Sequence, residues 1–113
     1  MIEKWDMPPV FHRFYSLTGW LLDRVEKYPK SARFTFGQRI CDTAIGVIEA
    51  IVRAAYGRRR KENLDAANTD IEVLRVLLRL SKDRHYISPD QYEFAVGELL
   101  EIGKMIGGWL RSA

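Results

Sequence analysis

The stretch from residue 64 to residue 81 carries the pattern that restricts the fold most strongly. Apolar or small residues recur there at alternating intervals of three and four positions: Leu64, Ala67, Ile71, Leu74, Leu78 and Ser81. This spacing places all six side chains along one face of an α-helix, and it is typical of helices that pack lengthwise on one another. It predicts a helix over about residues 61–84.

Helical periodicity recurs in three further stretches, at about residues 10–28, 35–57 and 88–111. In the first, the expected core face holds Phe14, Leu17, Leu21, Val25 and Tyr28, and Leu22 is expected to widen it. Pro29 and Gly57 lie between these stretches, where such residues end helices, and residues 30–34 are expected to form a short basic loop. No stretch alternates apolar and polar residues for long enough to predict a strand. The sequence therefore predicts an all-α fold.

Short connections between four helices predict an antiparallel up-down four-helix bundle. A chain of 113 residues can bury one core, so residues 1–113 are expected to form a single domain.

Two helix starts carry the capping-box pattern, in which a hydroxyl and a Gln side chain bind free backbone amides. Thr35 with Gln38 predicts the start of the second helix, and Ser88 with Pro89 and Gln91 predicts the start of the last.

The third and fourth predicted helices carry more apolar surface than one small bundle needs. Val73, Val76 and Leu80 extend the apolar arc of residues 61–84 beyond its core face, although such a helix needs an arc of only about 100° to 140°. Large exposed apolar surfaces mark contacts with other proteins, so we expect a homo-oligomer. The expected interface residues are Val73, Leu77, Leu80, Phe94, Met105 and Trp109.

Charge is distributed unevenly along the chain. The total is only +3, but residues 24–61 hold ten basic and three acidic side chains, whereas residues 62–101 hold four basic and nine acidic ones. One interpretation is a basic surface that meets nucleic-acid phosphates and an acidic one that meets a basic partner. The alternative is two ordinary solvated faces.

Basic side chains on the predicted helices form the candidate binding site. On the third helix they fall within about 60° of one another, and on the second Arg39 and Arg53 are nearly aligned on the polar face, with Gly46 and Ala50 between them. Guanidinium groups at such spacing suit a phosphate backbone. The alternative is pairing with nearby acids, such as Glu72 with Arg75 or Arg79 with Asp83. The candidates from charge are Arg39, Arg53, Arg58, Arg59, Arg60, Lys61, Arg75, Arg79 and Lys82.

Residue types argue against catalysis and cofactor chemistry. The single cysteine, Cys41, is expected to be a small buried apolar residue, and His12 and His85 lack metal-ligand spacing. Gly103, Gly107 and Gly108 lie within a predicted helix, where they are expected to allow close packing rather than to cradle a phosphate. We expect no enzyme activity, metal, cofactor or small-molecule substrate. We also expect no transmembrane helix or signal peptide, and a cytoplasmic location.

Three segments together resemble one known family. They are Tyr28 to Ile40 (YPKSARFTFGQRI), Leu74 to Leu80 (LRVLLRL) and Ile102 to Leu110 (IGKMIGGWL). In this order and spacing they resemble the accessory variability determinant (Avd) proteins of diversity-generating retroelements. The match covers about residues 28–113, and residues 1–27 agree only in helical pattern.

The resemblance implies a homopentameric barrel of four-helix bundles that associates with the element's reverse transcriptase and with nucleic acid, template RNA first and DNA second. It implies a non-catalytic role in mutagenic retrohoming, the copying of a template repeat into a variable repeat. By position, the resemblance implies four binding residues, Arg33, Arg39, Arg75 and Arg79. Arg33 is the one that charge alone did not single out. Two alternatives stay open: a bundle of the type encoded in 23S rRNA intervening sequences, and a plain protein-interaction bundle.

Overall fold

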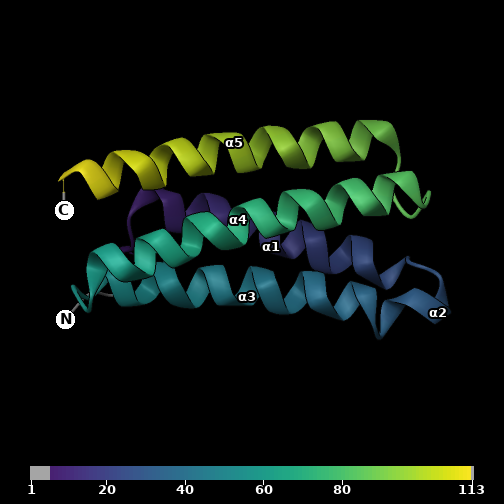
Figure 1. Ribbon diagram of the computed structural model, residues 1–113, viewed down its shortest axis with the longest axis horizontal. Coiled ribbons are helices and arrows are strands. Elements are labelled where there is room, and N and C mark those ends of the chain that lie inside the picture. Colours follow the sequence, from purple (N-terminus) through teal and green to yellow (C-terminus); the bar gives the residue numbers. More distant parts are fainter. Residues whose placement is uncertain (1–5, 113) are drawn as a thin grey trace.

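Four long antiparallel helices make up the fold (Figure 1). The computed structural model describes residues 6–112, which contain no strand. The long helices are α1 (Pro9–Glu26), α3 (Phe36–Ala55), α4 (Arg60–Asp83) and α5 (Pro89–Ser112), and α2 (Lys30–Arg33) is a single turn. The all-α, four-helix prediction is confirmed, and every predicted end of a long helix lies within two residues of the observed one.

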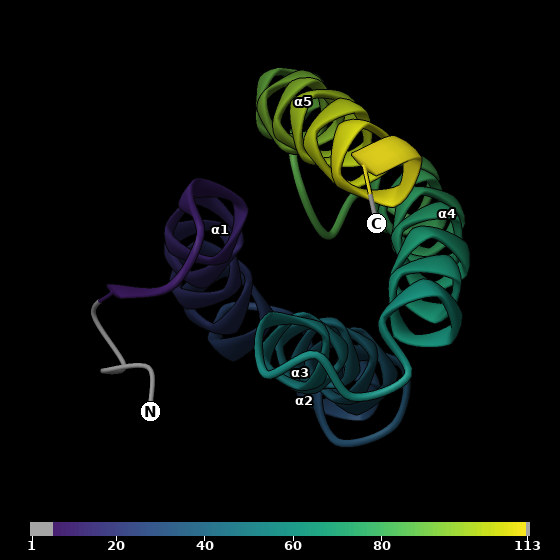
Figure 2. The same ribbon diagram turned by 90° about the vertical axis from the view of Figure 1, so that its left-hand side faces the viewer.

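Neighbouring helices follow a ring in the order α1, α3, α4, α5 (Figure 2). The contact between α3 and α4 is the most extensive and that between α1 and α5 the least. The α1–α5 side is held in part by Arg13, whose Nε and Nη2 donate to the two carboxylate oxygens of Glu98 at 3.1 and 3.0 Å. The α1–α3 side and the α4–α5 side therefore lie on opposite sides of the molecule.

The core matches the predicted apolar faces. The six residues of the α4 pattern, from Leu64 to Ser81, are the residues that α4 buries. In α1, Phe14, Leu17 and Leu21 are buried as expected. The alternation of three and four positions identified the inward face correctly because the geometry of an α-helix fixes the side of the helix on which each side chain lies.

Two residues lie on other faces than predicted. Leu22 was expected to widen the core face of α1 but is 41% exposed. Ala50 was expected on the polar face of α3 but is 5% exposed, because α3 is packed between α1 and α4 and buries a wider arc than a single stripe.

The connection before α3 is not the predicted loop. Residues 30–33 form a helical turn that begins after Pro29, whose carbonyl accepts from the amides of Ala32 and Arg33. The predicted capping box at Thr35 is also wrong. The Thr35 hydroxyl points back to the carbonyls of Ser31 and Ala32 at 3.3 and 3.4 Å, because the preceding turn brings these acceptors beside it.

The other predicted helix ends are confirmed. The Ser88 hydroxyl accepts from the amide of Gln91 at 3.1 Å, and Gln91 Oε1 accepts from the amide of Ser88 at 2.9 Å, which completes the capping box of α5. Gly57 has a φ of 76° and follows the last turn of α3, where its missing side chain avoids the strain of a left-handed backbone. His85 takes the same role after α4, with a φ of 63°.

Candidate nucleic-acid and partner interfaces

The ten candidate cations divide equally by what their side chains contact. Five make contacts within the chain: Arg33, Arg59, Arg60, Arg75 and Lys82. Five are exposed and form no side-chain hydrogen bond or ion pair among the described residues: Arg39, Arg53, Arg58, Lys61 and Arg79. We call this second group the free cations. They can turn toward a phosphate without first breaking an internal bond.

Helix packing explains why some of the candidates are engaged. Arg60 Nε donates to the carbonyl of Ala54 at 2.9 Å, and its guanidinium lies 5.7 Å from the centre of the Trp109 ring. Arg33 donates to the carbonyl of Tyr28 at 3.3 Å. These two arginines hold the ends of helices together, so they are structural as well as basic.

Acidic neighbours engage two more residues on α4. Arg75 Nη1 donates to both carboxylate oxygens of Glu72, at 3.0 and 3.2 Å, as the ion-pair alternative predicted. The predicted pair of Arg79 with Asp83 does not form, since Asp83 lies 3.8 Å from the ammonium of Lys82 instead. Arg79 therefore stays free while Arg75, one turn away, does not.

Antiparallel packing gathers the free cations at the two ends of the molecule. Arg39 is near the start of α3 and Arg79 is near the end of α4, so both lie toward the end that also holds α2 (Figure 1). Arg53, Arg58 and Lys61 lie at the opposite end, around the α3–α4 turn. The molecule is 41 Å long, so the two clusters are separate contact points.

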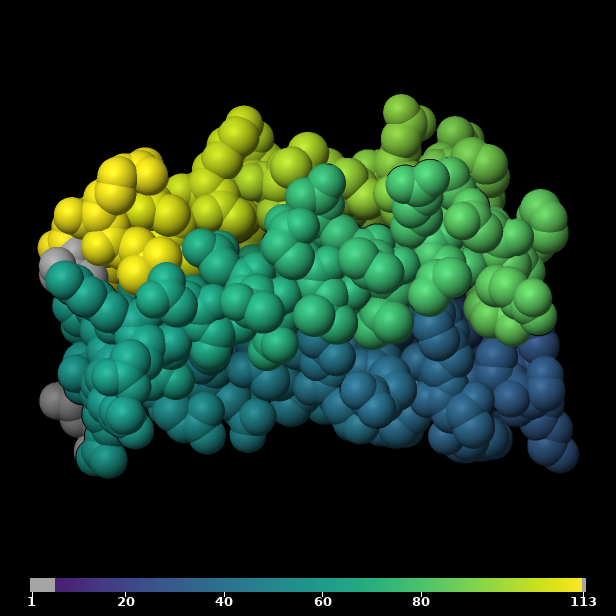
Figure 3. Space-filling model, in the orientation of Figure 1, coloured from purple at the N-terminus to yellow at the C-terminus, as the bar shows by residue number. Residues whose placement is uncertain are grey.

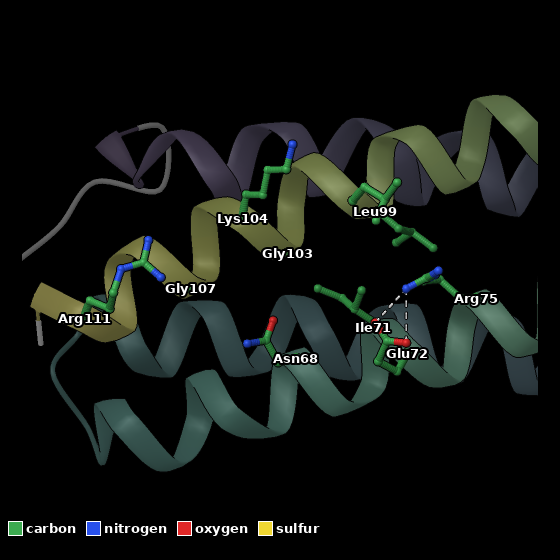
Figure 4. A pocket seen from close by; sticks show the side chains of 10 residues that line it. Asn68, Ile71, Glu72, Arg75, Leu99, Gly103, Lys104, Gly107 and Arg111 are labelled. Atoms are coloured by element: carbon green, nitrogen blue, oxygen red, sulfur yellow. Dashed lines mark hydrogen bonds and ion pairs between the residues drawn. The ribbon is translucent and has the colours of Figure 1, made fainter.

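A groove of 520 Å³ runs between α4 and α5 (Figure 4). Arg75 from α4 and Lys104 and Arg111 from α5 line it, and Ile71 and Leu99 lie at its base. We call it the basic groove. Lys104 and Arg111 were not among the predicted site residues, although their spacing of seven positions places them on one side of the helix.

Gly103 and Gly107 leave space in the wall of the basic groove. A Cβ on Gly103 would meet no heavy atom within 4 Å, and one on Gly107 would meet only Arg111 Nη1, at 3.6 Å. The prediction that these residues allow close packing is wrong within this chain, because both face the groove rather than a neighbouring helix.

A second groove, of 330 Å³, lies between α1 and α3. Leu22 and Ile45 line it and are 41% and 44% exposed, and Gly19 lies among them. The exposed charged residues of the same two helices are of both signs: Asp23, Glu26, Asp42 and Glu49, and Arg39 and Arg53. None of the six residues that line it is charged, so we call it the apolar groove.

The predicted interface residues also divide by burial. Val73, Leu80 and Phe94 are 41%, 45% and 50% exposed. Val76 is exposed as well, and the helix that carries it, α4, crosses the middle of the face seen in Figure 3. The others, Leu77, Met105 and Trp109, are partly buried and pack against the chain's own core.

Buried titratable groups are few. Burial raises the pKa of the Cys41 thiol, as expected for a small apolar core residue, and burial also raises the pKa of the Asp70 carboxyl. Among residues 6–112, no cluster of three His, Cys, Asp or Glu side chains is arranged to hold a metal ion. No helix in that range is long and apolar enough to cross a membrane.

Taken together, the fold and its surfaces define a small helical protein with grooves on two opposite sides, one of them lined by basic residues, and with free cations at both ends. A family model described as bAvd-like matches residues 10–113, so the chain belongs to the bAvd-like family and is an Avd-type protein. The predicted resemblance is thus confirmed, and the match includes the first helix. Neither the curated proteins nor the solved structures contain a match.

Proposed function

We propose that this chain is a non-catalytic accessory scaffold of a diversity-generating retroelement. It holds the element's reverse transcriptase and template RNA together, which supports mutagenic retrohoming. The observation that carries the proposal is the bAvd-like family match over residues 10–113. Joining two partners on one scaffold raises their effective concentration, so a protein with no catalytic residues can promote priming and copying.

Nucleic acid is bound by the free cations in this proposal. Arg39 and Arg79 form one contact point and Arg53, Arg58 and Lys61 form the other. Each guanidinium can bind a phosphate through two donors, and each neutralised phosphate releases counterions. RNA and its DNA copy both offer this backbone, and the base sequence is not read by such contacts.

Self-association strengthens such binding. The family resemblance implies a homopentamer, and five copies with a formal charge of +3 would carry about +15. Exposed apolar residues on α4 and α5 supply surface for other proteins, among them Val76 and Phe94. Asp90 and Glu93, exposed at the start of α5, are candidate contacts for a basic polymerase.

The test compares two pairs of substitutions with the same loss of charge. Arg39→Gln with Arg79→Gln removes two free cations, whereas Arg59→Gln with Arg75→Gln removes two engaged ones. We expect the first pair to lower template RNA affinity at least tenfold at about 0.1 M salt and to reduce the slope of log affinity against log salt by about two. The second pair should change both quantities less. Fluorescence anisotropy with labelled template RNA measures them.

Equal losses for the two pairs would mean that net charge, not the free cations, carries the binding. Unchanged affinity in both would remove nucleic acid from the proposal. Co-purification with the reverse transcriptase tests the other half of the proposal. RNA affinity without that association favours the 23S rRNA intervening-sequence type. The absence of both RNA affinity and that association favours a plain interaction bundle.

A further inference from the structure

We propose that one end of this chain binds unpaired nucleotides, with a base seated in a pocket between the start of α3 and the end of α4. This inference rests on the nucleic-acid binding in the proposed function and adds that the nucleic acid bound at this end is single-stranded. The pocket has a volume of 250 Å³ and is lined by Phe36, Leu80, Arg84 and Tyr86. We call it the aromatic pocket.

The way in which α4 ends explains why an aromatic ring lies here. His85 has a φ of 63°, and the amide of Tyr86 donates to the carbonyl of Ser81 at 2.8 Å. This pattern ends a helix and turns the chain back across its last turn. The centre of the Tyr86 ring thereby lies 5.1 Å from that of Tyr28 and 6.2 Å from that of Phe36. The aromatic pocket is therefore formed by rings that the fold holds in place.

The size and walls of the aromatic pocket suit a single unpaired base. Sites that enclose a whole small molecule measure about 300 to 1,000 Å³, and this pocket is smaller. Leu80 is 45% exposed and the rings of Phe36 and Tyr86 are only partly buried, so a planar group can enter from solvent. Stacking on aromatic side chains tolerates any base, because every base has a π-face. Bases in a duplex stack on one another instead, so the pocket selects unpaired ones.

Charge favours a nucleotide as the occupant. Arg84 is the one charged residue that lines the aromatic pocket, and it forms no side-chain hydrogen bond or ion pair among residues 6–112. Its guanidinium can bind the phosphate of a seated nucleotide through two donors. Two free cations adjoin the pocket in sequence, since Arg39 is one turn beyond Phe36 on α3 and Arg79 precedes Leu80 on α4.

The segments around the pocket contain few acids, and both segments lie at the end that holds α2 (Figure 1). Residues 27–39 hold four basic side chains and no acidic one, and residues 79–86 hold three basic and one acidic. That acid, Asp83, lies 3.8 Å from the ammonium of the preceding lysine. The next acid along α3, Asp42, accepts from Gln38 Nε2 at 2.9 Å. Phosphates beside a seated base would therefore meet cations, whereas an apolar protein segment would leave these cations without a partner.

A single strand compared with a duplex tests the inference. The probes are an oligomer of about twelve uridines and the same strand paired with its complement, both labelled for fluorescence anisotropy. At about 0.3 M salt, where phosphate contacts are weakened, we expect the parent chain to bind the single strand at least about fivefold more tightly. Equal affinity for the two probes would overturn the inference and leave the proposed function standing. No binding to either probe at about 0.1 M salt would instead refute the nucleic-acid binding on which it rests.

Tyr86→Leu removes one ring from the aromatic pocket and keeps an apolar side chain there. We expect it to lower the affinity for the single strand at least about fivefold and to leave the slope of log affinity against log salt unchanged, since no phosphate contact is lost. Tyr15→Leu is the matched control, because Tyr15 is 52% exposed on α1 and lies outside the pocket. Its affinity should equal that of the parent chain, and circular dichroism verifies the helicity of both variants.

A folded Tyr86→Leu variant that binds the single strand as tightly as the parent chain would overturn the inference. Loss of co-purification with the reverse transcriptase in that variant, with RNA affinity unchanged, would show that the aromatic pocket takes a protein side chain instead of a base.

Cross-linking gives a readout that needs no substitution. A single iodouridine in the oligomer cross-links under ultraviolet light to an aromatic ring on which it stacks. We expect mass spectrometry of the parent chain to locate the cross-link at Tyr86 or Phe36. A cross-link confined to Phe34, which is 69% exposed before the start of α3, or to rings on other elements would refute the pocket. The absence of any cross-link from a bound oligomer would refute it as well.

Discussion

Single polar contacts distinguish residues that the sequence treats alike. The Tyr28 hydroxyl donates to Ser81 Oγ at 2.8 Å, and Ser81 in turn donates to the carbonyl of Leu77 at 2.9 Å. Both side chains are buried, so this chain of hydrogen bonds joins the end of α1 to α4 in the core. Sequence periodicity identified both positions as inward-facing, but it could not show that they bond to each other.

Tyr28→Phe tests this contact. It removes the donor and keeps the ring, so we expect the free energy of unfolding to fall by about 1 to 2 kcal/mol. Ser81→Ala should cost a similar amount, and the double variant should cost less than the sum of the two. Urea denaturation followed by circular dichroism measures all three. Strictly additive losses would show that the two hydroxyl groups do not interact.

Helices α1 and α3 approach closely at one glycine. A Cβ on Gly37 would lie 2.7 Å from Val25 Cγ1 and 3.4 Å from the carbonyl oxygen of Ala32. A Cβ added to Gly97 in α5 would have no heavy atom within 4 Å. The two glycines look equivalent in the sequence, since both lie within an amphipathic helix, but only the first is required by packing.

Alanine at each glycine should therefore have opposite effects. Gly37→Ala forces Val25 or the backbone of α2 to move, and we expect it to destabilise the fold by about 1 to 3 kcal/mol. Gly97→Ala should stabilise it by about 0.5 to 1 kcal/mol, because alanine loses less backbone entropy in a helix. Thermal and urea denaturation of the two variants measure these effects, and a stabilising Gly37→Ala would contradict the close approach.

All four long helices share one core, and this core contains two titratable side chains, Tyr28 and Cys41. Burial raises the pKa of Tyr28, although the bond to Ser81 opposes this, and burial raises the pKa of Cys41. Their neutral forms are thus favoured in the folded state, whereas the unfolded chain ionises them at their ordinary pKa values. Both groups stabilise the fold fully below those ordinary values.

Stability should therefore fall at alkaline pH. As pH rises above about 8.5, Cys41 ionises first in the unfolded chain, and Tyr28 follows above about 10, so the free energy of unfolding decreases through this range. Cys41→Ala should reduce the loss between about pH 8 and pH 10 and leave the later loss in place. Urea midpoints measured across pH 7 to 11 give the profile, and an identical profile for the variant would exclude the thiol as a cause.

Local sequence determined the helices and their inward faces. The six-residue pattern of α4, the Ser88 cap and the Gly57 helix end all hold in the structure, because each depends on residues within a turn or two of one another. The bAvd-like family was recognisable for a related reason, since its signature consists of short segments in order.

Only the tertiary structure decided which surface residues are available for binding. Arg60 and Lys61 are adjacent in the sequence, yet Arg60 is held by the carbonyl of Ala54 on α3 and lies over the Trp109 ring of α5, whereas Lys61 is free. The basic groove exists because α5 packs along α4, so that Lys104 and Arg111 line the same groove as Arg75, and no local pattern specifies that packing. A helix sequence sets which side of the helix is apolar, but which neighbour faces each remaining side depends on how all four long helices pack together.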